Sequence, residues 1–147
     1  MENFDPVEIL IVEDNPTDAE LMIRALKKHN LANELFVAED GQQALDFIFC
    51  KGQFESRHPL KSIKVIFLDL KLPKINGLEV LKEIKSNPET KKLPVVIITS
   101  SKEDPDIKAA YDLGANSYVV KPVDFNDFIK AMQHLGLFWL LVNEAPR

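Results

Sequence analysis

Three short runs of consecutive apolar residues, rich in β-branched side chains, occur along the chain at residues 9–12, 65–68 and 95–98. None of them shows the polar alternation of a half-exposed strand. The pattern therefore predicts strands that are buried on both faces, as in a parallel sheet covered by helices. Weaker strand signals lie at residues 34–37 and 117–120.

Each predicted strand is followed by a segment in which apolar residues recur at helical spacing, which predicts five amphipathic helices packed on the sheet. Asn15 is placed to cap the first helix and Pro16 to occupy its first position. Asp40 and Gln43 have the spacing of a capping box at the start of the second. The apolar positions of the five segments are Ala19, Met22, Ile23 and Leu26; Ala44, Leu45 and Ile48; Leu78, Leu81 and Ile84; Ile107, Ala110, Tyr111 and Leu113; and Phe125, Phe128, Ile129, Met132 and Leu135.

The strict alternation of strand and helix predicts right-handed crossovers and an α/β fold with a parallel sheet. A chain of 147 residues is too short for a closed eight-fold barrel, so an open doubly wound sheet remains. Ligands bind such sheets at the carboxyl ends of the strands, near the point where the strand order reverses. We find no internal repeat and no interdomain linker, and we expect one domain over residues 1–147. The longest irregular stretch, residues 51–62, is unusually long for such a connection.

Composition and charge narrow the class of protein. The chain is 46% hydrophobic and 28% charged, as is ordinary for a globular protein, and its net charge of −5 argues against nucleic acid or an anionic membrane as the main partner. Cys50 is the single cysteine, which excludes an intrachain disulfide and favours a reducing compartment. No apolar leader is visible, and the apolar stretch at residues 137–142 is far shorter than the ~20 residues needed to span a bilayer. We therefore expect a cytoplasmic protein.

Chemically active side chains follow four of the five predicted strands. Glu13 and Asp14 come after the first strand, Asp69 after the third, Thr99 ends the fourth and Lys121 follows the fifth. Each residue alone has an ordinary explanation, such as a helix cap, a β-branched strand residue or a surface charge. The carboxyl ends of parallel strands meet at one edge of the sheet, however. We therefore expect three carboxylates, a hydroxyl and an ammonium to converge there.

That combination of groups is suited to phosphoryl chemistry. Three close carboxylates repel one another unless a cation lies among them, and oxygen ligands suit Mg²⁺. The ammonium of Lys121 adds a positive charge, so the edge is suited to a compact dianion bridged to the metal. Asp69 can act as a nucleophile and form an acyl phosphate, to which Thr99 would donate its hydroxyl.

These motifs resemble the receiver domains of two-component response regulators. The matching segments are residues 10–15, 65–73 with Gly77, 96–100, 114–115 and 118–122. Thr99 lies 30 residues after Asp69, and Lys121 lies 22 after Thr99, which are the spacings of that family. The resemblance implies a flavodoxin-like, doubly wound five-stranded parallel sheet in the order 2-1-3-4-5, with five helices in three α/β/α layers. It implies a core at about residues 7–136 and leaves residues 137–147 as an apolar extension.

The resemblance also implies a role for each residue at this edge. Asp69 is the phosphoacceptor, which takes its phosphoryl group from a histidine kinase. Thr99 and Lys121 bind the phosphate, and Thr99 and Tyr118 form a switch pair. The Lys121–Pro122 peptide bond is expected to be cis, which would aim the ammonium inward. The implied Mg²⁺ ligands are Glu13, Asp14, Asp69 and the backbone carbonyl of Lys71.

The same resemblance predicts a signalling protein rather than an enzyme. Phosphorylation would shift the population toward a state in which Tyr118 turns inward and the face of the fourth helix, fifth strand and fifth helix is reshaped. Lys71 and Ser101 flank the path of an attacking water in the family, and neither is suited to orient it. Self-catalysed phosphorylation and dephosphorylation should therefore be slow, with a phosphorylated state that lasts minutes or more.

No output domain follows the fifth predicted helix, so the signal is expected to pass by protein contact. Phe138 and Trp139 lie in an apolar tail that either folds back on its own domain or forms a homodimer interface. This tail and the long connection at residues 51–62 are similar to those of stand-alone regulators paired with bacterial phytochromes, which form homodimers. A regulator of a non-phytochrome kinase, or a phosphorelay intermediate, is the alternative.

Three other classes of protein compete with this interpretation. Phosphatases of the haloacid dehalogenase type place a second Asp two residues after the nucleophile, where this chain has Lys71. A pure interaction module would not need all five residues of the edge. A dinucleotide- or flavin-binding protein would need a glycine-rich loop after the first strand, where Glu13 and Asp14 would instead repel a pyrophosphate.

Overall fold

The computed structural model describes residues 9–28, 34–55, 63–122 and 124–137. Five parallel strands form one sheet in the order β2-β1-β3-β4-β5, which confirms the predicted fold class and strand order. The strands are β1 (Ile9–Val12), β2 (Leu35–Ala38), β3 (Val65–Leu68), β4 (Val95–Thr99) and β5 (Ser117–Val120). The helices are α1 (Pro16–Lys28), α2 (Gly41–Ile48), the short 3₁₀ helix η1 (Gly52–Phe54), α3 (Gly77–Ser86), α4 (Asp104–Asp112) and α5 (Phe125–Leu137).

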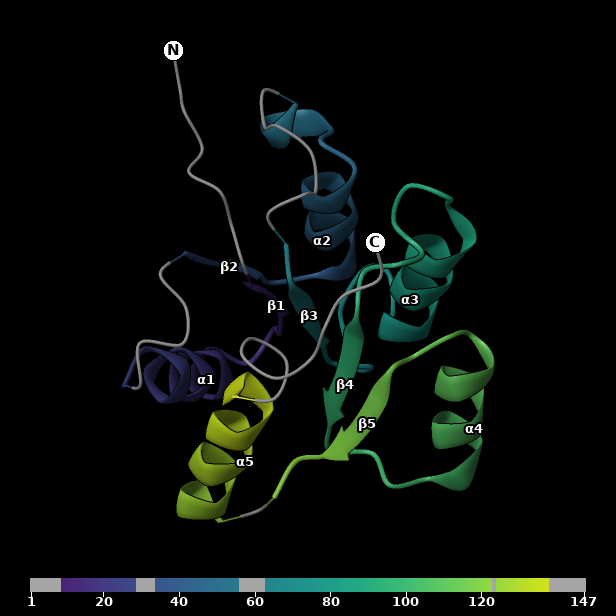
Figure 1. Cartoon of the computed structure of the whole chain (residues 1–147). Coiled ribbons are helices and arrows are strands. Elements are labelled where there is room, and N and C mark those ends of the chain that lie inside the picture. Colours follow the sequence, from purple (N-terminus) through teal and green to yellow (C-terminus); the bar gives the residue numbers. More distant parts are fainter. Residues whose placement is uncertain (1–8, 29–33, 56–62, 123, 138–147) are drawn as a thin grey trace.

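Helices cover both faces of the sheet, with α1 and α5 side by side on one face and α2, α3 and α4 on the other (Figure 1). The strands β1, β3 and β4 are buried along their whole length, as their unbroken apolar runs predict. The outer strands β2 and β5 are half-buried for most of their length, because each has a neighbour on one side only. The most apolar strands are therefore the central ones.

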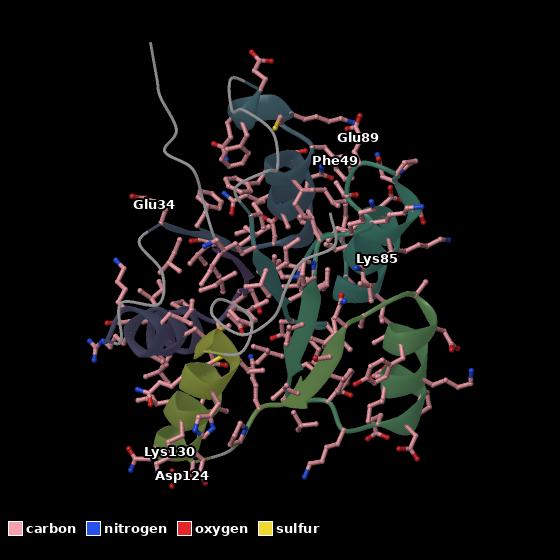
Figure 2. The ribbon with its side chains drawn as sticks, in the orientation of Figure 1. Glu34, Phe49, Lys85, Glu89, Asp124 and Lys130 are labelled. Carbon is pink, nitrogen blue, oxygen red and sulfur yellow. The ribbon has the colours of Figure 1, made fainter. Side chains whose placement is uncertain are left out.

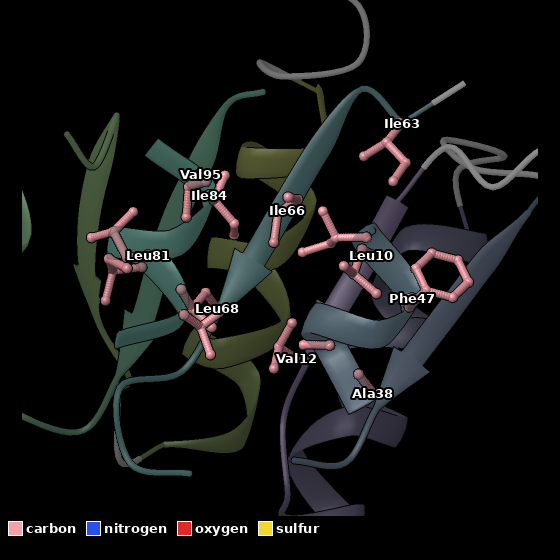
Figure 3. Packing of buried hydrophobic residues seen from close by; sticks show 14 of the residues in the cluster. Leu10, Val12, Ala38, Phe47, Ile63, Ile66, Leu68, Leu81, Ile84 and Val95 are labelled. Carbon is pink, nitrogen blue, oxygen red and sulfur yellow. The ribbon is translucent and has the colours of Figure 1, made fainter. Parts of the chain in front are cut away.

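Alternate side chains of each central strand enter two separate hydrophobic clusters. Leu10 of β1 points into the cluster under α2, α3 and α4, which also contains Phe47 and Ile84 (Figure 3). Its neighbour Ile11 points to the opposite face and packs with Met22 of α1 and other residues of α1 and α5. The sheet is thus the shared wall of two cores.

The two predicted helix caps are present. The Asn15 side-chain oxygen accepts hydrogen bonds from the amides of Thr17 and Asp18 at 2.9 and 3.1 Å. The Asp40 carboxylate accepts from the amide of Gln43 at 2.7 Å. The Gln43 side chain in turn accepts from the amide of Glu39, at 2.8 Å, whereas a standard capping box would use the amide of Asp40. Both caps start a helix immediately after a strand end, which keeps the connecting turns short.

The structure differs from the prediction at Tyr111 and adds a short helix to the long connection. Tyr111, expected on the apolar face of its helix, is 50% exposed, because α4 buries little beyond Ala110. Part of the long connection forms η1, whose Phe54 packs edge-on against the stacked rings of Phe36 and Phe47. No helix among the described residues is long and apolar enough to cross a bilayer.

Candidate functional site

The acidic side chains meet because β1 and β3 are neighbours in register. Val12 pairs with Leu68, so the residues that follow these two positions lie side by side at the carboxyl edge. The Asp69 amide donates to the carbonyl of Val12 at 3.0 Å, which extends the pairing by one residue. Carboxylate oxygens of Glu13, Asp14 and Asp69 all lie within 4.8 Å of one another. The predicted convergence of three carboxylates is therefore present.

Lys121 reaches this cluster from the edge strand β5. Its backbone amide donates to the carbonyl of Thr99 at 2.7 Å, which fixes the start of its side chain beside β4. Its ammonium contacts carboxylate oxygens of Glu13 at 2.5 Å and of Asp69 at 2.9 Å. A third carboxylate, that of Asp18, also lies at 2.9 Å. The Lys121 side chain is only 11% exposed, so one partly buried cation bridges the acids that follow β1 and β3 and an acid of α1.

The backbone at Pro122 differs from the prediction. None of the peptide bonds between described residues is cis, so the Lys121–Pro122 bond is trans and the expected cis-proline is wrong. The trans form of such a bond is ordinarily favoured by about 0.5–1 kcal/mol. The long side chain of Lys121 reaches Asp69 from a trans backbone, so the approach of the ammonium does not require the cis form.

Burial and charge act against each other here. Burial raises the pKa of Glu13, which is 2% exposed; the hydrogen bond from Lys121 opposes this change and nearby Asp69 adds to it, which leaves the pKa at about 7. Burial alone would lower the pKa of Lys121, but its hydrogen bonds to Glu13, Asp18 and Asp69 outweigh burial and hold its pKa above the usual value. The cluster thus holds more negative charge than one ammonium balances.

The donor set fits a hard divalent cation. Oxygen atoms of three carboxylates lie close enough to share one ion, which is the ligand type that Mg²⁺ prefers. Asp14 is exposed, so water molecules can complete a coordination shell. The Lys71 amide donates to an Asp69 carboxylate oxygen at 3.1 Å and orients that side chain. The Lys71 carbonyl remains a predicted ligand.

Thr99 and Tyr118 are linked through a third residue, Ser101. The Thr99 hydroxyl is buried at the end of β4 and accepts from the Ser101 amide at 3.4 Å. The Tyr118 hydroxyl donates to the Ser101 carbonyl at 2.9 Å, and burial raises the pKa of this phenol. The Ser101 hydroxyl donates to Asp106 in the first turn of α4, at 2.5 Å. Ser101 therefore joins the two residues of the predicted switch pair to α4.

Asp18 was not identified from the sequence as part of this site. A signal for it was available, since Asn15 and Pro16 place Asp18 in the first turn of α1, and it follows Asp14 by four residues, about one helical turn. The predicted partner residues Phe138 and Trp139 lie outside the described residues.

Comparisons with known proteins agree with this geometry. The family model described as response regulator receiver domain matches residues 9–133. Response regulator Rcp1 of Synechocystis sp. is 40% identical over 146 residues, which are 99% of this chain and 97% of that protein. Its Mn²⁺-bound crystal structure matches with a TM-score of 0.89 at 38% identity, covering 97% of this chain and 100% of that one.

Two further solved structures are similar over nearly the whole chain. The phosphorylated cyanobacterial phytochrome response regulator RcpA has a TM-score of 0.89 and 33% identity, and it covers 97% of this chain and 100% of its own. The bacteriophytochrome response regulator AtBRR is 50% identical with a TM-score of 0.73, over 96% of this chain and 100% of its own.

Proposed function

Because this chain belongs to the response regulator receiver domain family, we propose that Asp69 is the residue that accepts the phosphoryl group from a histidine kinase. One observation carries the proposal. Asp69 follows the central strand β3, between the acids that follow β1 and Thr99 at the end of β4, and its buried carboxylate contacts the ammonium of Lys121. A nucleophile held beside a fixed cation is suited to a group that arrives with negative charge.

The transfer itself is a single displacement at phosphorus. A carboxylate oxygen of Asp69 forms a bond to phosphorus while the bond from phosphorus to the histidine nitrogen breaks, and the electron pair of that bond stays on the imidazole. The Lys71 amide keeps the Asp69 carboxylate oriented during the attack. The Lys121 ammonium stabilises negative charge on the transferred oxygens. Mg²⁺ held by Glu13, Asp14 and Asp69 would supply further charge neutralisation when bound.

The hydrogen bonds around Ser101 supply a route from the phosphoryl group to α4. In our proposal the phosphoryl oxygens attract the Thr99 hydroxyl, and the Ser101 amide loses its acceptor. The Ser101 carbonyl and hydroxyl then change position, and with them the anchors of Tyr118 and Asp106. This rearrangement reshapes the surface formed by α4, β5 and α5 and passes the signal on by protein contact.

We propose a phytochrome-type histidine kinase as the phosphodonor, since two similar structures are described as phytochrome response regulators. A kinase of another type, or a phosphorelay, is the alternative. The proposal further includes one receiver domain over residues 1–147, a homodimer with Phe138 and Trp139 at its interface, and cytoplasmic action without nucleic acid or membrane. Only slow phosphoryl turnover is expected, with a phosphorylated state that lasts minutes.

Phosphorylation of Asp69 is tested by incubating the protein with MgCl₂ and acetyl phosphate and measuring intact mass. We expect wild type to gain one phosphoryl group, Asp69→Asn to gain none, and the control Asp112→Asn to match wild type, because Asp112 pairs with Lys108 on the exposed face of α4. Absence of a gain in wild type, or an equal gain in Asp69→Asn, would overturn the proposal.

Two labelling experiments test the rest of the proposed function. Labelled phosphate on Asp69 should decay over minutes after the donor is removed, whereas decay within a few seconds would contradict slow turnover. Labelled phosphate should also pass faster from a phosphorylated bacterial phytochrome than from a chemotaxis-type kinase used as control. Equal rates would favour the non-phytochrome alternative.

A further inference from the structure

Asp18 contacts the phosphoryl-accepting edge without belonging to its acidic cluster. It lies in the first turn of α1, and its carboxylate is 2.9 Å from the ammonium of Lys121. The three residues that can share a cation are Glu13, Asp14 and Asp69. Asp18 thus touches the ammonium of this site from a position outside the described cation-binding group.

The ammonium of Lys121 is therefore shared between two kinds of partner. Glu13 and Asp69 hold it from the side of the acidic cluster, and Asp18 holds it from the side of α1. A negative charge on the α1 side draws the ammonium away from the cluster. If the Asp18 charge is removed, the Lys121 ammonium interacts with Glu13 and Asp69 alone.

Asp18 also lies on an approach to Lys121. Both residues line a pocket of about 350 Å³ between α1 and α5, together with the apolar side chains of Leu21 and Phe128. A second acid, Asp124, lines the same pocket at the start of α5 (Figure 2). An anionic phosphodonor that enters here meets the Asp18 carboxylate directly beside the ammonium.

We propose that Asp18 is a positioning residue: by pairing with the Lys121 ammonium from α1, it weakens the interaction of that ammonium with the acidic cluster. It thereby strengthens cation binding at the cluster and weakens the reaction with small anionic phosphodonors. The inference rests on the proposed function, in which a bond from Asp69 to phosphorus forms as acetate leaves acetyl phosphate with its electron pair.

The charge argument predicts that Asp18→Asn binds Mg²⁺ more weakly but reacts with acetyl phosphate faster. The Kd for Mg²⁺ should rise about threefold to tenfold, because Lys121 then repels the cation more strongly. The second-order rate constant with acetyl phosphate, at saturating MgCl₂, should rise about threefold to tenfold, because the Lys121 ammonium is no longer paired with the Asp18 carboxylate and attracts the anionic donor more strongly. A residue with a merely structural role would impair both cation binding and phosphorylation when changed.

The experiment combines calorimetric titration with MgCl₂ and intact-mass kinetics with acetyl phosphate. Asp18→Ser is a second charge-removing variant and should shift both values in the same directions as Asp18→Asn. Asp18→Glu keeps the charge and should stay within about twofold of wild type in both. Asp124→Asn is the matched control. It removes an acid from the same pocket, and asparagine can still accept from the amides of Asn126 and Asp127 to cap α5.

The outcomes separate this inference from the proposed function. Opposite effects in Asp18→Asn and Asp18→Ser, absent in Asp18→Glu and Asp124→Asn, support it. A loss of both cation affinity and rate, unchanged values, or equal shifts in Asp124→Asn overturn it. If wild type gains no phosphoryl group, the proposed function fails, and the MgCl₂ titrations of the five proteins still decide the role of Asp18.

Discussion

The close approach of Gly77 to the backbone beside Asp69 gives the sharpest test of how the site is held. Gly77 begins α3, and its amide donates to the carbonyl of Leu70 at 2.9 Å. A Cβ atom added to Gly77 would lie 2.2 Å from the Asp69 carbonyl oxygen and 2.5 Å from the Leu70 Cα, where ordinary contact begins at 3.4 Å. Both atoms are backbone, so Gly77→Ala must displace α3 or the turn that carries Asp69.

Two opposing effects determine how much Gly77→Ala lowers the free energy of unfolding. Overpacking of this kind costs about 1–3 kcal/mol, and contact with rigid backbone places Gly77→Ala at the upper end. Alanine offsets up to about 1 kcal/mol of that, because it restricts the unfolded chain more than glycine does. We expect the free energy of unfolding to fall by about 2 kcal/mol. We also expect weaker Mg²⁺ binding, because the displacement reaches Asp69.

Urea unfolding followed by circular dichroism measures the first effect, and calorimetric titration with MgCl₂ measures the second. Gly114→Ala is the control, because Gly114 has a φ of +105° and lies against Lys85, away from the acidic cluster. That variant should lose stability through backbone strain and keep its Mg²⁺ affinity. If Gly77→Ala unfolds within about 0.5 kcal/mol of wild type, or if both variants bind Mg²⁺ alike, the reasoning is wrong.

Three further predictions concern stability, each measured by urea unfolding. Asp40→Ala should cost about 1 kcal/mol at pH 7 through loss of a helix cap. The hydrogen bond from the Gln43 amide lowers the pKa of Asp40 below its ordinary value of 3.8, so the stability that the charged carboxylate contributes should be present above pH 3.8 and be lost as the pH falls through the folded-state pKa. Asp40→Asn should abolish this pH dependence. Lys85→Met should cost about 1–3 kcal/mol, because the Lys85 ammonium (Figure 2) donates to three acceptors, among them the Asn116 side chain at 3.1 Å, and each of them loses this hydrogen bond. An unchanged free energy of unfolding would contradict this. Phe54→Ala should cost about 3 kcal/mol by emptying the aromatic cluster, whereas Phe54→Leu should cost less.

The sequence was sufficient for the fold and for most of the site, because both depend on strand ends. An unbroken apolar run such as residues 65–68 indicates a strand buried on both faces. Parallel strands bring their carboxyl ends to one edge of the sheet, and this does not depend on the conformation of the loops. The convergence of Glu13, Asp69 and Lys121 follows from that rule, although the residues are far apart in the chain.

Features that depend on how a helix sits on the sheet could not be predicted in the same way. Helical spacing places Tyr111 on the apolar side of α4, but it does not say how much of that side is covered. The contact of Asp18 with Lys121 likewise depends on the position of α1 relative to the end of β5. The trans bond at Pro122 was missed because the resemblance, rather than the local chain, suggested the cis form.

The division of the interior into two clusters has a consequence for how such a protein can change. The residues under α1 and α5 pack in one cluster, and those under α2, α3 and α4 in the other, with the sheet between them. Substitutions on one side need to be accommodated mainly on that side, since the two clusters have no residue in common within the described part of the chain. The outer surfaces of the two layers are therefore free to diversify separately, except at the surface formed by α4, β5 and α5, which takes one helix from each layer.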